Sequence, residues 1–260
     1  SDSVDIVIVT NDVLSIGGSL RMHNTDTYSV SVEEDNLFGH GDQVSVKGLF
    51  DAGREEPFGY GFDFTKRNIM GSFIDASAGF TNFNKTRNTG EREERVTFFR
   101  LTRPLVSRFM KWTYGSVLEL HKTQNFYSTD SLYQQEYKYK YDIIDAWGTF
   151  NLDADKPDRD GSIDHARLRR LFGLRVIQQK FDERPLRYEK EYHYSYADLQ
   201  AVLGAFSVFK QNFYKTQYIY GFGRNEDVPE GLDASLTLGW TKKQQRDRPY
   251  AGLSFQKYYF

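Results

Sequence analysis

The segment VSVEEDNLFGHGDQVSV, residues 30–46, contains the pattern that decides the fold. On each side of its centre, valines alternate with small or polar residues, as in a β-strand with one apolar face. Between the two runs, Gly39 and Gly41 flank His40, and Asn36 lies just before them. Glycine and asparagine tolerate the positive φ angles of tight turns. The segment therefore predicts two antiparallel strands joined by a turn at Asn36, Gly39 and Gly41.

The acidic residues near His40 raise the alternative of a metal site. A metal site needs further ligands at a recognisable spacing. No paired spacing connects His40 with the other histidines, which are His23, His121, His165 and His193. We therefore interpret the stretch as a turn and assign no metal ligand in the chain.

The same two-residue period recurs along the chain and predicts about twelve strands. Besides the opening pair, a first strand is expected at 14–24. The clearest further runs lie at 58–65, 74–81, 111–121 and 232–241, and weaker ones at 96–101, 137–150, 168–181, 200–209, 218–222 and 250–260. No segment keeps a helical period over several turns. An all-β antiparallel protein follows.

The two faces of these strands differ in an unusual way. One face carries aliphatic residues with aromatic residues near the strand ends, and the other carries small and polar residues. Aromatic residues make up 16% of the chain, with 18 Tyr and 21 Phe. Strands of roughly ten residues with a lipid-facing apolar side, a polar lumen and aromatic girdles are typical of transmembrane β-barrels. We predict such a barrel.

Composition excludes several classes of protein. The net charge is -2 over 260 residues, which argues against nucleic acid as a partner. No run approaches 18 apolar residues, so a transmembrane helix is not expected. Cysteine is absent, which excludes disulfides and thiolate metal sites.

The start of the chain, SDSVDIVIVTND, is apolar on both faces and predicts the last strand of a preceding domain. We place the end of that domain at 1–13 and the barrel, or part of it, at 14–260. The connections alternate between short and long through the first nine strands, as in outer-membrane barrels with short periplasmic turns and longer external loops. The turn at 36–41 is then periplasmic.

Two charged stretches are candidate sites. Within DADKPDRDGSID, Asp158, Asp160 and Gly161 occupy three places of a calcium loop, but Lys156 and Arg167 replace both end ligands. A solvated turn is the better interpretation. Within YGFGRNEDVPEGLD, the most charged short connection, a cluster of salt bridges in the lumen or a loop is predicted from Arg224, Glu226 and Asp227.

Hydrolysis would require a nucleophile, a base and an orienting group. The chain has no G-x-S-x-G motif, and the sequence does not connect His121 with any serine. We assign no catalytic or cofactor-binding residue and do not expect an enzyme.

The order of these pieces resembles the Omp85 superfamily of outer-membrane assembly and translocation proteins, which includes BamA-like and TamA-like proteins. VDIVIVTND is similar to the last strand of a periplasmic POTRA domain, and VLSIGGSL to a first barrel strand, with Gly17 and Gly18. The turn at Asn36, Gly39 and Gly41 resembles the family's turn between the second and third strands. YIYGFGRNEDVPEG followed by RPYAGLSF resembles Bacteroidetes-type members. The family's Arg-Gly-Phe motif has no match.

The resemblance implies part of a sixteen-stranded barrel in the bacterial outer membrane that assists the insertion, assembly or translocation of polypeptides. Gly17 and Gly18 would lie in a weakly paired first strand at a lateral seam. Implied partners are outer-membrane lipid, lipopolysaccharide, client outer-membrane polypeptides and accessory lipoproteins, and no cofactor is implied. The residues alone also allow a lipid-modifying hydrolase of the outer membrane, or a passive porin or solute channel.

Overall fold

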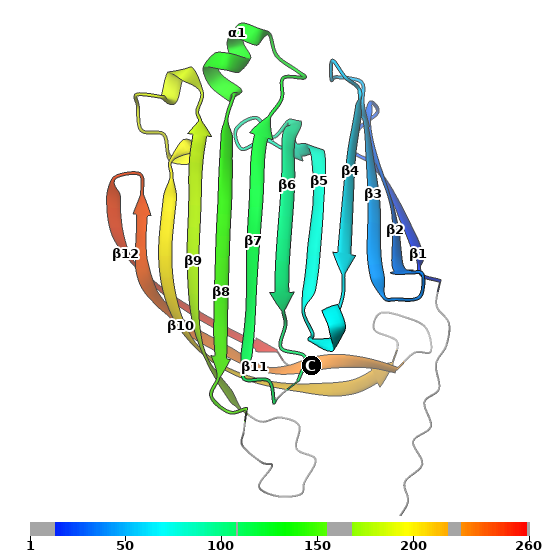
Figure 1. The fold of residues 1–260 in the computed structure, drawn as a ribbon, viewed down its shortest axis with the longest axis vertical. Coiled ribbons are helices and arrows are strands. Elements are labelled where there is room, and N and C mark those ends of the chain that lie inside the picture. The colour runs from blue at the N-terminus through cyan, green and yellow to red at the C-terminus, as the bar shows by residue number, and fades with distance from the viewer. Residues whose placement is uncertain (1–13, 108, 155–167, 218–224, 259–260) are drawn as a thin grey trace, which may run out of the picture.

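A computed structural model describes residues 14–107, 109–154, 168–217 and 225–258, which form one sheet of twelve antiparallel strands. Chain order and sheet order are the same, so each strand pairs with the strands before and after it (Figure 1). The strands are β1 (Ile16–Met22), β2 (Thr27–Leu37), β3 (Asp42–Asp51), β4 (Phe58–Lys66), β5 (Asp75–Lys85), β6 (Arg92–Arg103), β7 (Trp112–Thr123), β8 (Lys140–Asn151), β9 (Arg169–Glu183), β10 (Leu199–Gln217), β11 (Asn225–Lys243) and β12 (Arg246–Tyr258).

The predicted all-β fold with about twelve antiparallel strands is confirmed. The sheet is open, however: within the described residues β1 pairs only with β2, and β12 pairs only with β11. Closure into a barrel stays a prediction. The expected end of a preceding domain at 1–13 and the expected strand at 218–222 lie outside the described residues.

Helical structure is confined to short pieces in the connections. The longest is α1 (Asp130–Leu132) with the π-helical turn η2 (Tyr133–Tyr137) between β7 and β8. The other pieces are single 3-10 turns, η1 (Ile69–Gly71), η3 (Leu186–Tyr188) and η4 (Tyr194–Tyr196). No helix in the described part of the chain is long and apolar enough to cross a membrane.

One face of the sheet, here called the apolar face, carries exposed large hydrophobic side chains. Residues directly opposite each other on neighbouring strands share a face, and Leu236 of β11 lies opposite Phe206 of β10 and Leu253 of β12. The same register places the following exposed residues on this face: Ile16, Leu20, Val30, Val32, Val46, Phe62, Phe99, Leu118, Ile144, Phe172, Leu174, Val202 and Leu238.

The other face, here called the polar face, carries paired charges and small residues. Ion pairs join Lys47 to Asp63, and Arg175 to Asp145, in each case across neighbouring strands. Glycine is required where a large side chain lies flat on this face. A Cβ added at Gly115 would come within 2.7 Å of Nε1 in the indole of Trp147, which covers the glycine.

At one end of the sheet, the connections fold across the polar face. Arg87, between β5 and β6, donates a hydrogen bond of 2.8 Å from Nη2 to Oε1 of Gln179 on β9. The Tyr127 hydroxyl, between β7 and β8, donates to Oδ2 of Asp51 on β3 at 2.8 Å. Because these contacts bridge strands that are not neighbours, the polar face is concave there. A buried aromatic core lies beneath the connections, formed by Tyr139, Tyr141, Phe181 and Tyr196.

Candidate functional site

The turn predicted at 36–41 joins β2 to β3. Gly39 and Gly41 have the expected positive φ, 76° and 74°, and Phe38 shares that conformation with a φ of 53°. The side-chain Oδ1 of Asn36 accepts a hydrogen bond from the backbone N–H of Gly41 at 2.7 Å, which closes the turn. His40 is exposed. Nothing in this geometry requires chemistry of its side chain.

The two glycines of the proposed seam lie in β1, the shortest strand of the described sheet. Gly17 faces Glu33 on the polar face, and a Cβ there would lie 3.3 Å from the Glu33 side chain. Gly18 lies opposite Val32 on the apolar face. The two residues therefore serve opposite faces.

The charged stretch near the end of the chain differs from its sequence interpretation. Glu226 and Asp227 were expected in a connection, but their backbones lie in β11, opposite Thr216 and Lys215 of β10. The ladder extends through these polar residues because backbone pairing does not depend on apolar side chains. Arg224 lies outside the described residues.

The calcium-like stretch also lies mostly outside the described residues, which end at Ala154 and resume at Leu168. Its first residue, Asp153, is buried and binds Arg170. Oδ1 of Asp153 accepts from Nη2 of Arg170 at 2.8 Å, and Oδ2 accepts from Nε at 3.1 Å and from the backbone N–H at 2.9 Å. Asp153 thus anchors the start of β9. No group of three or more His, Asp or Glu side chains suited to a metal ion occurs among the described residues.

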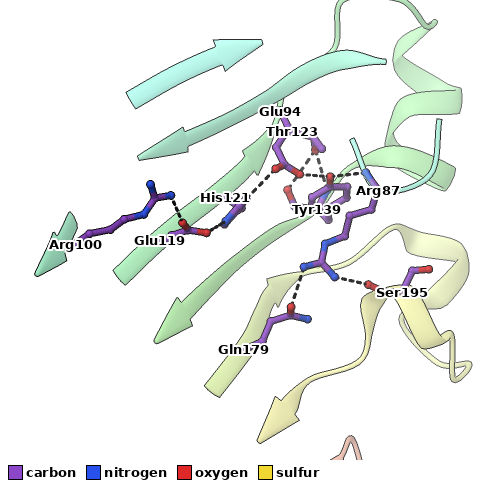
Figure 2. Close-up of polar contacts among 9 residues, drawn as sticks. All are labelled: Arg87, Glu94, Arg100, Glu119, His121, Thr123, Tyr139, Gln179 and Ser195. Carbon is purple, nitrogen blue, oxygen red and sulfur yellow. Dashed lines mark hydrogen bonds and ion pairs between the residues drawn. The ribbon is translucent and has the colours of Figure 1, made fainter. Parts of the chain in front are cut away.

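The most developed polar site is a chain of contacts on the polar face of β6 and β7 (Figure 2). Nη2 of Arg100 donates to Oε1 of Glu119 at 2.8 Å. The second oxygen of Glu119 lies 3.1 Å from Nε2 of His121, and Nδ1 of His121 lies 2.8 Å from Oε1 of Glu94. The Tyr139 hydroxyl donates to the other oxygen of Glu94.

Strand register explains how these side chains meet. Val96 of β6 lies opposite His121 of β7, and Glu94 lies opposite Thr123. Glu94 is therefore the diagonal neighbour of His121 on the same face, within reach of a long side chain. The ring of His121 also stacks on Tyr141 of β8, with centroids 4.2 Å apart and planes inclined by 11°. The imidazole is therefore held by two carboxylates and one stacked aromatic ring.

This geometry defines the charge on His121. An ionised carboxylate can only accept a hydrogen bond, so contacts from both ring nitrogens to Glu94 and Glu119 require a proton on each nitrogen. The site then alternates in charge, with two cations, Arg100 and His121, and two carboxylates. Neither nitrogen of His121 is open to take a proton from a hydroxyl group, because both already bond to carboxylates.

Tyr139 connects this charged chain to the connections above it. Its backbone N–H donates to Oγ1 of Thr123 at 2.9 Å, and its hydroxyl accepts from the backbone N–H of Arg87 at 3.2 Å. Cζ of Arg87 lies 4.2 Å from the centroid of the Tyr141 ring. Nη1 of Arg87 donates to the backbone oxygen of Ser195 at 3.3 Å (Figure 2). Burial raises the pKa of the Tyr139 hydroxyl, so it remains a donor. The site fastens three connections to the sheet.

A second buried cation lies in the connection between β3 and β4. Arg54, between β3 and β4, is 4% exposed, and its Cζ lies 4.0 Å from the centroid of the Phe126 ring. Its guanidinium nitrogens have no hydrogen-bond partner among the described residues. Burial lowers the pKa of Arg54, and burial also raises the pKa of Tyr127 nearby. The cation–π contact compensates in part for the missing hydrogen bonds.

Sequence reasoning named His121 but did not find its partners. Alternation places Glu119 and His121 on one face of one strand, and this signal was present in the sequence. Glu94, by contrast, lies 27 positions from His121 along the chain, and Arg87 lies in a connection whose side-chain direction no periodicity predicts. Register between strands supplied the missing contacts.

Comparisons with known proteins find no matching family model, no matching curated protein and no matching solved structure.

Proposed function

We propose that this chain is part of an outer-membrane β-barrel of the Omp85 type, which assists the insertion, assembly or translocation of polypeptides. The resemblance of the sequence motifs supports this class. The observation that carries the proposal is a backbone edge at β1 that has no second partner strand among the described residues, in a sheet whose apolar face suits lipid.

The apolar face supports a membrane location. Soluble monomers rarely expose contiguous apolar patches beyond a few hundred Å², yet here exposed hydrophobic side chains continue from β1 to β12. On β11 the alternating apolar residues from Leu232 to Trp240 span nine positions. A tilted strand crosses the hydrocarbon core with about 9–11 residues. Lipid is the solvent in which such a face is stable.

The hydrogen bonds of β1 show which backbone groups lie at its edge. Oxygen of Ser15 accepts from the N–H of Asp35 at 2.9 Å, and the N–H of His23 donates to Thr27 at 2.9 Å. Hydrogen-bonded pairs alternate along an antiparallel ladder, so odd-numbered residues of β1 bond to β2. Even-numbered residues, such as Gly18 and Leu20, point their N–H and C=O groups to the other side.

Those edge groups need a partner in a membrane. Unpaired backbone groups cost several kcal/mol each in the hydrocarbon core, so an open sheet edge is not stable there. An edge strand can therefore pair with another strand and act as a template for it. Gly18 weakens the strand, because glycine adds no packing and loses more entropy on ordering. These properties favour a seam that exchanges partners.

The His121 cluster favours this function over the hydrolase alternative. A general base must be able to accept the proton of a nucleophile. Both nitrogens of His121 instead bond to Glu94 and Glu119. The cluster is better suited to holding the connections in place than to proton transfer.

The test removes one edge hydrogen-bond donor. Leu20→Pro deletes an N–H that faces away from β2, and proline is tolerated on an edge strand at such a position. Leu20→Ala is the matched control, since it removes the side chain and keeps the N–H. We expect Leu20→Pro to remain a folded barrel, with a gel mobility that changes on heating. Assembly of other barrels should fall about fivefold, because one template hydrogen bond of about 1 kcal/mol is lost.

The measurement is the amount of folded outer-membrane barrels in cells whose only copy of the protein is the variant. Leu20→Ala should keep assembly near the wild-type level. If folded Leu20→Pro assembles client proteins as well as Leu20→Ala does, the template role of β1 is wrong. Monodisperse behaviour without detergent would instead overturn the membrane location.

A further inference from the structure

A row of like charges crosses the apolar face near the end that carries the connections 124–139 and 184–198. Arg95 of β6 lies directly opposite Lys122 of β7, and Lys122 lies directly opposite Lys140 of β8. One step along each strand on the same face, the row gives way to Thr97, Leu120 and Asp142. Like charges directly opposite each other destabilise a sheet. The row therefore calls for a compensating anion.

The chain supplies that anion only in part. Nζ of Lys140 lies 3.0 Å from Oδ2 of Asp182. Arg95 and Lys122 are both exposed and have no ion pair or hydrogen bond within the part of the chain that the structure describes. Arg100 and Arg175 of the polar face differ in this respect, since each is paired with a carboxylate.

The position of the row indicates what kind of anion it meets. Phe99 and Leu118, one pair further into the apolar face, are 44% and 46% exposed. Cζ of Arg95 lies 6.0 Å from the ring centroid of Phe80, so the side chain leans over apolar surface. Long basic side chains at such a boundary place their charge at the level of lipid headgroups. In the proposed membrane location, the anions at this boundary are those of lipid headgroups.

We propose that Arg95 and Lys122 bind phosphate groups of lipopolysaccharide in the outer leaflet. This inference rests on the proposed membrane location but not on the assembly activity. Two of the three longest connections, 124–139 and 184–198, lie at this end of the sheet, and in outer-membrane barrels the longer loops are external. A guanidinium binds phosphate through paired N–H groups, and an ammonium binds it as a point charge. Acyl chains would lie against Phe99, Leu118 and their neighbours.

The experiment titrates the purified protein, folded in neutral detergent, with lipopolysaccharide and counts bound molecules by native mass spectrometry. Each basic residue near an anionic lipid surface contributes about fivefold in affinity. We expect the double variant Arg95→Gln/Lys122→Gln to bind about 25-fold more weakly, the product of two such factors. Lys210→Gln is the matched control, because Lys210 is an exposed lysine on the apolar face of β10, distant from the row. It should change affinity by less than about twofold.

Three further arms identify the ligand. Lipopolysaccharide stripped of its lipid phosphates should bind the wild type as weakly as the intact lipid binds the double variant. Phosphatidylglycerol should bind more weakly than lipopolysaccharide. Millimolar inorganic phosphate should not displace bound lipopolysaccharide. Equal binding of phosphatidylglycerol would overturn the glycolipid assignment. Unchanged affinity in the double variant would overturn the site.

The outcome for this site is separable from the proposed function. Every variant is first checked for heat-modifiable gel mobility, which reports a folded barrel. A protein that shows no such barrel in detergent contradicts the membrane location itself. A folded wild type that binds lipopolysaccharide no more tightly than phosphatidylglycerol contradicts only the lipid site.

Discussion

Two regions are stabilised in different ways: the end of β6–β9 that carries the connections 124–139 and 184–198, and the hairpin of β11 and β12. At the first, Tyr139 and Tyr196 are each 1% exposed, and ion pairs, ring contacts and hydrogen bonds join three connections to the strands. In β12, all residues are exposed except Gly252, which is half-buried. The hairpin is held mainly by its backbone ladder to β10.

The difference lies in how much of each region the chain itself covers. Where the polar face is concave, the chain covers itself and builds a core of its own. Where the sheet ends at β12, the hydrophobic side chains of Leu253 and Phe255 are 82% and 67% exposed among the described residues. The hairpin depends on surroundings outside the described residues, and we infer that lipid and further strand pairing supply them.

The largest expected effect comes from comparing a tyrosine in the aromatic core with a tyrosine in the β11–β12 hairpin. Tyr139→Ala leaves a cavity in the aromatic core and removes the donor to Glu94, and we expect a loss of about 4 kcal/mol in unfolding free energy. Tyr250→Ala on β12, where the ring is 44% exposed, should cost less than about 1 kcal/mol. Urea unfolding in detergent, followed by gel mobility, measures both. Equal losses would mean that the hairpin is packed as tightly as the core.

The next contrast compares the two faces of the hairpin. Leu236 lies at the middle of the apolar run of β11, and Thr237 lies beside it on the polar face. An arginine on the lipid face of a barrel costs about 2–4 kcal/mol at the bilayer midplane. We therefore expect Leu236→Arg to lower the unfolding free energy in phospholipid vesicles by about 3 kcal/mol, and Thr237→Arg to lower it clearly less. The reverse order would show that the faces are assigned the wrong way round.

The smallest effect concerns the hairpin turn between β11 and β12. Gln244 is the first of its two central residues and has a φ of 56°, a conformation that favours glycine at that place. Gln244→Gly should therefore stabilise the protein by up to about 1 kcal/mol. Gln245→Gly, the control, should give no gain, since a positive φ is found only at Gln244 of this pair. Thermal unfolding in detergent distinguishes the two variants. A lower unfolding temperature for Gln244→Gly would contradict the inferred backbone strain at Gln244.

Much of the fold was predictable because its signal is local. A strand exposes alternate side chains to different surroundings, so the period of two at 232–241 or 58–65 marks both the strand and its faces. The turn at Asn36, Gly39 and Gly41 was also predictable, since positive φ limits the choice of residue. The charged residues of the stretch after Gly223 carried no such signal, and β11 begins earlier than their polarity suggested.

The sequence by itself determined that this protein is an antiparallel sheet with one apolar and one polar face, because side-chain alternation is a property of each strand alone. Only the tertiary structure decided that Glu94 meets His121, that Arg87 reaches Gln179, and that the strands form an open sheet. Those contacts depend on register between strands and on how connections fold over a concave face. Neither is encoded in any single segment, because both arise when distant segments pair.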